Sequence, residues 1–556
     1  MQADNKKILR QSIKIVAKVA SFFIIIVTVI MVMQYIQLKK ISPESSTWLP
    51  ELKEKFSNDR KNEALRTHIR ELDLLSRRAW FTGQNQLYTG GILLLGAGGA
   101  LLVALIILAL TAEKRVNKDS SANTTEPKNS TLRIVIAAIG CGLFIAAVVI
   151  YDLEKKEKKT NLIAPEKKVS AKEFYANWPS FRGPDISGVA PNRKLFSDWD
   201  IPSKHNLLWK VKVPRQGFSS PILWNNKLFV TGGDKKDREL YCYEANSGKL
   251  LWRHSAGSSA TLPKVSNDTG FAASTPATDG QRVFAAFATG DIICVDFDGK
   301  RVWSKKFTVP DNPYGYASSL LTTPDKLIVQ YDDNIRQLLM AFDSASGREL
   351  WRKERKAAIS WSSPVKINVD GGSQIVILTC ESVEGFDLET GKQLWREDCM
   401  EGEVATSAAF ANGRVLVAND NAVAAAIDPV KGEILWENDE LDLPDVSSPV
   451  ALGDMLFIFT SGGVGLCVNA ESGELNWEHE FEDGFYNSPL LVGDRIIVID
   501  KKGIAYIIIP SEKEFKLERT CKVGEMLLST PVPGKNKLWL RSNKYLYCVG
   551  KKETNQ

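Results

Sequence analysis

A short motif recurs along the chain from about residue 177 onward, and it constrains the fold more than any other feature. The motif is a pair of small polar residues followed by proline, and similarity at a fixed period indicates a repeat architecture. Two further copies keep the polar pair and lose the proline, at Ser318-Ser319-Leu320 and Thr406-Ser407-Ala408. The complete copies are Ser219-Ser220-Pro221, Ser274-Thr275-Pro276, Ser362-Ser363-Pro364, Ser447-Ser448-Pro449, Asn487-Ser488-Pro489 and Ser529-Thr530-Pro531.

A second motif closes each unit: an acidic or polar residue, a turn with glycine, then tryptophan. Three apolar or alternating runs separated by turn residues lie between the two motifs, and the tryptophan segment adds a fourth. Four strands in roughly 40 to 50 residues are typical of a propeller blade. A seventh copy has decayed to Pro510…Glu518; the others are Glu244…Gly248…Trp252, Asp296…Gly299…Trp303, Asp343…Gly347…Trp351, Asp387…Gly391…Trp395, Asp428…Gly432…Trp436 and Asn469…Gly473…Trp477.

The two ends of the repeat region indicate how the ring closes. The last unit, from Ser529 to Gly550, stops before any tryptophan strand, while an unmatched strand, Leu208-Trp209-Lys210-Val211, precedes the first unit. Pairing the two completes a blade and removes sheet edges that would invite aggregation. The sequence therefore predicts an all-β, eight-bladed propeller of four-stranded antiparallel blades, rather than seven blades, closed by the segment around Trp209.

The cysteines fit this repeat and indicate no metal or haem chemistry. The chain has eight cysteines without a C-x-x-C motif, and only four histidines, which are scattered. Small residues stand at one position of the third strand, where a free cysteine packs as a small apolar group: Cys242, Cys294, Cys467 and Cys548, with Ala341, Gly385 and Ala426 in other copies. Spacing leaves a disulfide between Cys380 and Cys399 open.

Three apolar windows before the repeats predict membrane-spanning helices, at about 15–38, 91–112 and 132–151. Lysines and arginines flank the start of the first window and fill the short connection between the second and third. The positive-inside rule therefore predicts a cytoplasmic N-terminus and a propeller outside the cytoplasm. The expected organisation is a membrane region at 1–152 with an amphipathic helix at about 58–81, a charged linker at 153–172, the propeller at 173–550 and a tail at 551–556.

Net charge argues against a nucleic-acid partner. It is +5 for 556 residues, and the basic and acidic side chains are interspersed rather than gathered on one segment.

The repeats resemble the pyrroloquinoline-quinone-like propeller family, whose blades end in an acidic-x-x-[Ser/Thr]-Gly-Lys-x-x-Trp docking motif. Asp387 to Trp395 matches the motif throughout, and Glu244 to Trp252 nearly does; the lead-in Asn177 to Pro184 also resembles that of bacterial members. The resemblance implies that each motif tryptophan packs between adjacent blades. The tryptophans given this role are Trp209, Trp252, Trp303, Trp351, Trp395, Trp436 and Trp477.

Two branches of that family set the functional alternatives. Quinoprotein dehydrogenases bind the quinone and calcium on the propeller axis, and many stack the quinone on an adjacent cysteine pair, which this chain lacks. BamB-like proteins are non-catalytic and bind other proteins through loops. The sequence favours the second branch: a scaffold of the bacterial inner membrane that presents the propeller to the periplasm, in contact with the lipid bilayer and with envelope proteins, without a cofactor. A membrane-bound dehydrogenase with the quinone and calcium is the alternative, and a ligand sensor is a third possibility.

Aromatic residues before the polar-pair motifs are candidates for a binding surface at one mouth of the central channel: Phe218, Phe271, Tyr316, Trp361, Phe485 and Tyr486. Such a ring could bind a flat ligand, a glycan or a peptide, or it could simply plug the channel. The acidic turns at Asp332-Asp333-Asn334 and Asp420-Asn421 are interpreted as hairpin turns rather than calcium ligands.

Overall fold

The computed structural model describes residues 2–41, 94–108 apart from 95 and 100, and 169–551 apart from 260. The chain divides into two compact units, Met1–Glu166 and Lys167–Gln556.

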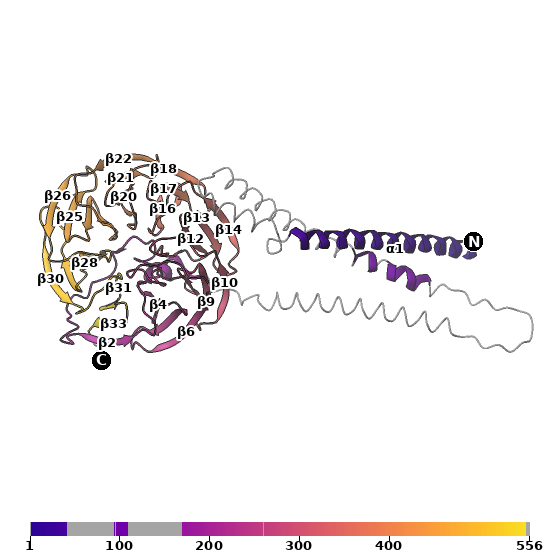
Figure 1. Ribbon diagram of the computed structural model, residues 1–556, viewed down its shortest axis with the longest axis horizontal. Coiled ribbons are helices and arrows are strands. Elements are labelled where there is room, and N and C mark those ends of the chain that lie inside the picture. The colour runs from indigo at the N-terminus through magenta and orange to yellow at the C-terminus, as the bar shows by residue number, and fades with distance from the viewer. Residues whose placement is uncertain are drawn as a thin grey trace, which may run out of the picture. The chain divides into compact units, whose positions relative to one another are not determined.

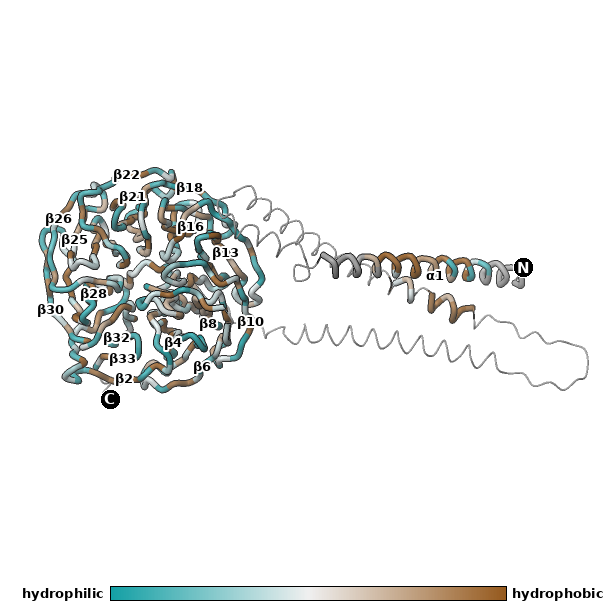
Figure 2. The backbone as a smooth tube through the Cα atoms, viewed as in Figure 1, coloured by the Kyte–Doolittle hydropathy of each residue, from teal (hydrophilic) through white to brown (hydrophobic). Residues whose placement is uncertain are grey.

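The first unit contains one long helix, α1 (Gln2–Ile41). Its segment Gln11–Met31 has a mean hydropathy of 2.4 and, at 21 residues, is long enough to cross a bilayer core. Apolar side chains on it are exposed, Phe22 to 67% and Ile15 to 62%, and Figure 2 shows the hydrophobic stretch within the helix.

Only α1, within the described ranges, meets the length of a membrane span, so the prediction of three spans is supported for one of them. The second window contains a shorter apolar helix, Gly96–Leu108. The third window at 132–151 and the amphipathic helix at 58–81 lie outside the described residues.

The second unit is a ring of eight β-sheets (Figure 1), as the repeat predicts. The first four blades follow chain order: β3 (Ile222–Trp224), β4 (Lys227–Gly233), β5 (Arg238–Glu244) and β6 (Leu250–Gly257); β7 (Ala277–Thr278), β8 (Arg282–Ala286), β9 (Asp291–Asp296) and β10 (Arg301–Lys306); β11 (Leu321–Thr322), β12 (Lys326–Asp332), β13 (Gln337–Asp343) and β14 (Glu349–Glu354); β15 (Val365–Val369), β16 (Gly372–Leu378), β17 (Val383–Asp387) and β18 (Gln393–Glu397).

The next two blades repeat the pattern, and the last two include strands from the start of the unit. They are β19 (Ala409–Ala411), β20 (Arg414–Ala418), β21 (Ala424–Asp428) and β22 (Glu433–Asn438); β23 (Val450–Leu452), β24 (Met455–Phe459), β25 (Val464–Asn469) and β26 (Leu475–Glu480); β27 (Leu490–Val492), β28 (Arg495–Ile499), β29 (Ile504–Ile508) and β30 (Leu517–Lys522) with β1 (Val189–Ala190); and β31 (Val532–Pro533), β32 (Lys537–Arg541) and β33 (Tyr545–Gly550) with β2 (Leu207–Lys212).

The ring closes where the sequence predicts. Strand β2 pairs antiparallel with β33, and Trp209 lies opposite Cys548. One feature was not predicted: β1 adds a fifth strand to the seventh blade, parallel to β27. A short helix, α5 (Ala171–Ala176), capped by the Ser170 side chain, precedes β1.

The core lies between the blades. Strands β4 and β5 are buried over almost their whole length, whereas β6 alternates between exposed and half-buried residues. Middle strands have a neighbouring blade on both faces, so they are apolar runs, while the outermost strand has one face toward solvent. The third-strand position noted above is the register partner of the motif tryptophan, as in Cys242 opposite Trp252 and Ala426 opposite Trp436.

Candidate ligand site on the propeller axis

The second residue of each polar pair joins one blade to the next at the axis. In seven of the eight repeats its hydroxyl accepts a hydrogen bond from the backbone N–H of the equivalent residue in the neighbouring blade. These bonds form a belt around the ring that includes the closing contact between the last blade and the first. They run from Ser220 N to Thr275 Oγ1 (2.9 Å), Thr275 N to Ser319 Oγ (3.2 Å), Ser319 N to Ser363 Oγ (2.9 Å), Ser363 N to Ser407 Oγ (2.9 Å), Ser407 N to Ser448 Oγ (2.9 Å), Ser448 N to Ser488 Oγ (3.1 Å) and Thr530 N to Ser220 Oγ (2.9 Å).

The first residue of the pair makes other hydrogen bonds. Ser274 and Ser447 donate to the next blade, to Ser318 O at 2.9 Å and Asn487 O at 3.1 Å, whereas other copies bond within their own blade. Thr406 donates to the carbonyl of Ala418 at 2.9 Å, and Ser529 donates to that of Arg541 at 2.6 Å. Successive side chains of an extended backbone alternate in direction. The residue just before the pair therefore faces the axis together with the second residue of the pair.

A cavity of about 350 Å³ lies on this axis. Its wall comes from the residues just before the polar pairs, in all eight repeats: Phe218, Ala273, Ala317, Trp361, Ala405, Val446, Tyr486 and Leu528. Hydroxyl-bearing residues of the belt alternate with them, and Phe181 of the lead-in also lines the cavity. The volume is at the small end of the roughly 300 to 1,000 Å³ usual for ligand pockets.

The lead-in and the residues that follow it, 177–190 in all, form hydrogen bonds with the innermost strands of several blades. Trp178 forms a β-bridge with Leu223 of the first blade, and Thr278 N donates to Pro179 O at 2.8 Å in the second. Farther along, Leu491 N of the seventh blade donates to Gly188 O at 2.9 Å. One continuous segment therefore contacts blades on different sides of the axis and contributes Phe181 to the inner surface of the cavity.

Three of the six aromatic residues named from sequence line the cavity: Phe218, Trp361 and Tyr486. The other three do not. Tyr316 and Phe485 stand two residues before their polar pairs, so alternation directs them into the blades, where Tyr316 donates to Gln330 O and Phe485 packs on Phe459. Phe271, three residues before its pair, is 9% exposed and also lies outside the lining.

Tyr314 was not named from sequence, and it organises one side of the mouth. Its ring centroid lies 5.3 Å from that of Trp361, and its hydroxyl donates to Glu403 Oε1 at 2.9 Å. The hydrogen bond to Glu403 raises the pKa of Tyr314 above its usual value. The Trp361 indole N–H donates to Asn312 Oδ1 at 2.9 Å. Aromatic faces and one carboxylate are thus held in place together.

Two further carboxylates, Asp268 and Asp445, line the cavity and were also missed. Burial, reinforced by the charges of these two groups, raises the pKa of the Tyr486 hydroxyl. One oxygen of Asp445, Oδ1, is shielded from solvent and has no hydrogen-bond partner. These acids stand at different distances before their polar pairs, so the repeat register gave no signal for them; their common feature is a place in the loop that leads into an innermost strand.

The motif tryptophans lie at the contacts between consecutive blades. The indole N–H of Trp252 donates to Phe297 O at 2.9 Å and that of Trp303 to Ser344 O at 3.0 Å, in each case a carbonyl of the following blade. The glycine of that blade's motif lies against the same ring: a Cβ on Gly299 would stand 2.7 Å from the Trp252 ring. The corresponding donations run from Trp209 to Ala245 O, Trp351 to Leu388 O, Trp436 to Ala470 O and Trp477 to Ser511 O.

Trp395 departs from this arrangement. Its indole N–H donates to Gln374 Oε1 of its own blade at 2.8 Å, and its ring covers Gly385, where a Cβ would stand 2.1 Å away. The third-strand position opposite Trp395 carries glycine instead of alanine or cysteine. The missing methyl group leaves room for the ring over its own blade.

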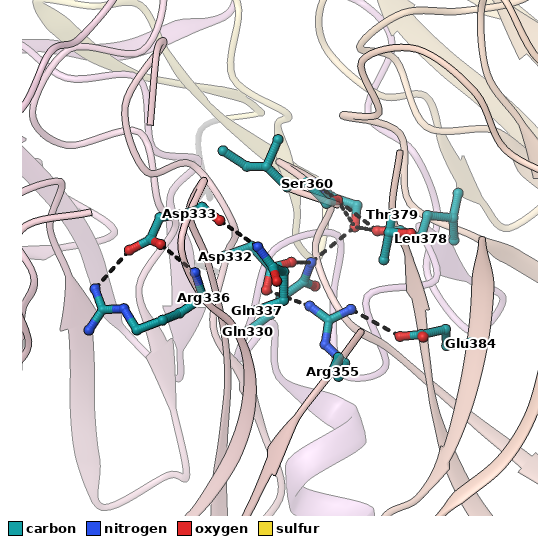
Figure 3. A network of polar contacts seen from close by, with 12 residues as sticks. Gln330, Asp332, Asp333, Arg336, Gln337, Arg355, Ser360, Leu378, Thr379 and Glu384 are labelled. Carbon is teal, nitrogen blue, oxygen red and sulfur yellow. Dashed lines mark hydrogen bonds and ion pairs between the residues drawn. The ribbon is translucent and has the colours of Figure 1, made fainter. Parts of the chain in front are cut away.

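A buried ionic network lies between the third and fourth blades (Figure 3). Arg355 pairs with Asp332 and, at 3.0 Å, with Glu384, and these side chains are 2% exposed or less. Asp333 forms the tight turn expected for it, accepting from Ile335 N and Arg336 N at 2.8 and 2.7 Å. Within the described part of the chain, no three His, Cys, Asp or Glu side chains are grouped to hold a metal ion. All seven cysteines described there, Cys380 and Cys399 included, are free thiols.

Comparison with known proteins agrees with this architecture. Residues 236–380 and 379–512 match the family model described as outer membrane protein assembly factor BamB. The blades are pyrroloquinoline-quinone-like repeats. The chain is 24% identical over 217 residues to outer membrane protein assembly factor BamB of Burkholderia pseudomallei K96243. The match covers 38% of this chain and 53% of that protein. It is 27% identical over 150 residues to the protein of the same name from Pseudomonas aeruginosa PAO1, covering 26% and 37%. The chain thus spans about half or less of the length of these relatives.

Among solved structures, the repeat propeller is similar to the quinohemoprotein alcohol dehydrogenase ADHIIG of Pseudomonas putida HK5. The TM-score is 0.51 at 12% identity, over 71% of this chain and 83% of that one. Likeness at this identity shows the fold alone.

The residues on the axis do not fit the quinone of such enzymes. Pyrroloquinoline quinone is a tricarboxylate, and the charged side chains that line the cavity are Asp268, Glu403 and Asp445, with no Lys, Arg or His in the lining. Bringing three more negative charges into this small space is electrostatically unfavourable.

Proposed function

We propose that this chain is a membrane-anchored, non-catalytic protein-interaction module of the bacterial cell envelope. The observation that carries the proposal is the axial cavity, in which aromatic faces and carboxylates surround one mouth. Its lining contains hydroxyls and carboxylates but no His, Cys or Lys that would complete a nucleophile and base pair. Aromatic anchors around a concave mouth are typical of protein recognition sites.

The similarity to BamB proteins supports an envelope location, since those relatives are named as outer membrane protein assembly factors. Helix α1 supports anchoring, because its span is apolar and its side chains are exposed. We further propose that the windows at 91–112 and 132–151 also cross the inner membrane. The N-terminus would then be cytoplasmic and the propeller periplasmic, where it contacts envelope proteins.

Photo-crosslinking in native membranes tests the interaction. A benzophenone amino acid replaces Tyr314, which is 40% exposed at the mouth, and in a matched strain it replaces Val430, which is 65% exposed on a hairpin turn outside the cavity. We expect discrete protein adducts from the Tyr314 position and not from the Val430 position. Equal patterns, or no adduct from the mouth, would contradict the proposal.

A direct assay separates the module from a dehydrogenase. Purified full-length protein is mixed with pyrroloquinoline quinone and calcium, and dye reduction is followed over a panel of alcohols and sugars. We expect no turnover above the protein-free control. Sustained turnover would overturn the proposal in favour of a quinoprotein enzyme.

A further inference from the structure

We propose that the axial cavity binds a cationic side chain, arginine or lysine, that a peptide segment of the partner inserts along the propeller axis. This inference rests on the proposed function and specifies the partner's chemistry.

The first observation in favour of a cationic ligand is the charge of the cavity. Asp268, Glu403 and Asp445 come from three different loops, between β6 and β7, β18 and β19, and β22 and β23, and they meet in one lining without a cationic side chain. Two buried arginines nearby, Arg182 and Arg541, are outside this lining, and both donate to backbone carbonyls. Carboxylates converging on a small apolar-walled space favour a positive ligand.

The second observation is a hydrogen-bond acceptor that has no donor. Asp445 Oδ1 is shielded from solvent and lacks a donor. Native structures satisfy nearly all buried acceptors, and each exception needs an explanation. A cation held in the cavity would offset the negative charge of this carboxylate, which has no donor at Oδ1 within the protein.

The third observation is the aromatic wall of the cavity. Tyr314 and Trp361 form a cluster held by hydrogen bonds to Glu403 and Asn312, so their faces are fixed before any ligand arrives. A cation over such a face within about 6 Å of the ring centroid is attracted by the ring quadrupole. The protein already uses this interaction outside the lining: the ammonium group of Lys501, which donates to Ser461 O at 3.0 Å, lies 5.2 Å from the ring centroid of Tyr486.

The shape of the cavity selects a side chain rather than a longer segment. It encloses about 350 Å³ on the axis of the ring. That is enough for one long side chain entering end-on, with the peptide backbone left among the loops at the mouth. Arginine is among the residues most enriched as interface anchors.

Saturation-transfer NMR on the full chain in nanodiscs tests the inference, because the method detects weak ligands of large particles. The probes are N-acetyl-Gly-Arg-Gly-amide and the same peptide with citrulline, which has nearly the shape of arginine without its charge. We expect transfer to the arginine side-chain protons and an affinity at least about tenfold higher than for citrulline.

Two triple variants remove the same formal charge at different places. Asp268→Asn, Glu403→Gln and Asp445→Asn empty the cavity of carboxylates, whereas Asp298→Asn, Asp370→Asn and Glu512→Gln change exposed acids outside it. We expect the first set to abolish the preference for arginine and the second to keep it. Asp445→Asn alone, which keeps the side-chain shape, should weaken arginine binding and serves if the triple variant does not fold.

Equal binding of both peptides, or equal loss in both triple variants, would overturn the inference. If the Tyr314 position still crosslinks a protein in membranes while arginine shows no preference, the interaction function stands and the cationic ligand is wrong. If neither experiment succeeds, both proposals fail.

Discussion

Replacing Arg355 by methionine should destabilise the propeller strongly. The substitution keeps much of the side-chain volume and removes a cation that pairs with two carboxylates, Asp332 and Glu384, all of them 2% exposed or less. Removing one partner of a buried ion pair costs about 3 to 5 kcal/mol, because a charge is left without compensation. Glu384 retains Arg396 at 3.0 Å and Asp332 retains the Gln330 amide at 2.8 Å, so we expect a loss of about 3 kcal/mol.

The loss should depend on pH. Burial already raises the pKa of Asp332 in the intact network, and removing the arginine raises it further. A carboxyl whose pKa is higher in the folded than in the unfolded state favours folding at low pH, and that contribution is lost as pH rises through the folded pKa. The deficit of the Arg355→Met variant should therefore be smaller at pH 5 than at pH 8.

Urea denaturation of the full chain in detergent, followed by tryptophan fluorescence, measures both effects. The triple variant Arg355→Met, Asp332→Asn and Glu384→Gln, which removes the charges together, should recover most of the stability. A single-variant loss below about 1 kcal/mol, within the usual range for an exposed pair, or a triple variant no better than the single one, would refute this reasoning.

Three other predictions concern how the blades dock. Trp209→Ala should lower the free energy of unfolding by about 3 kcal/mol, because the indole between the last and first blades is lost; a change under about 1 kcal/mol in urea titration would argue against this contact. Gly299→Ala should destabilise more than Gly257→Ala in the same assay, since both have positive φ but only Gly299 lies against a ring, that of Trp252. Burial raises the pKa of the Cys242 thiol to about 12, so N-ethylmaleimide at pH 8 should label it only on unfolding; fast labelling of folded protein, seen by mass spectrometry, would contradict this.

The sequence predicted the ring because its information is periodic. Polar pairs and tryptophan motifs repeat once per blade, and the incomplete units at the two ends required each other. The extra strand β1 could not be predicted this way, because Val189–Ala190 is not part of any repeat and pairs with β27 only through tertiary contact. The different contact made by Trp395 could have been predicted from the sequence, because Gly385 stands opposite it where other repeats have cysteine or alanine.

The site was less predictable, for a different physical reason. Phe218, Trp361 and Tyr486 stand at the one position that faces the axis, while Tyr316 and Phe485 are a single residue off and turn into the blades. Aromatic type was therefore a weaker guide than alternation along the strand. The carboxylates come from loops of unequal length, where no period fixes the direction of a side chain.

The most direct test of the architecture, on which the cavity depends, is disulfide trapping between the two ends of the unit. Lys210 of β2 lies opposite Tyr547 of β33. With cysteines at both positions and a protease site in the exposed loop near Ser259, the cleaved fragments should stay linked under non-reducing conditions. Lys210 paired with a cysteine at Tyr506, which lies in the third strand of the preceding blade, should give no link. A link to position 506, or none to 547, would contradict closure by β2.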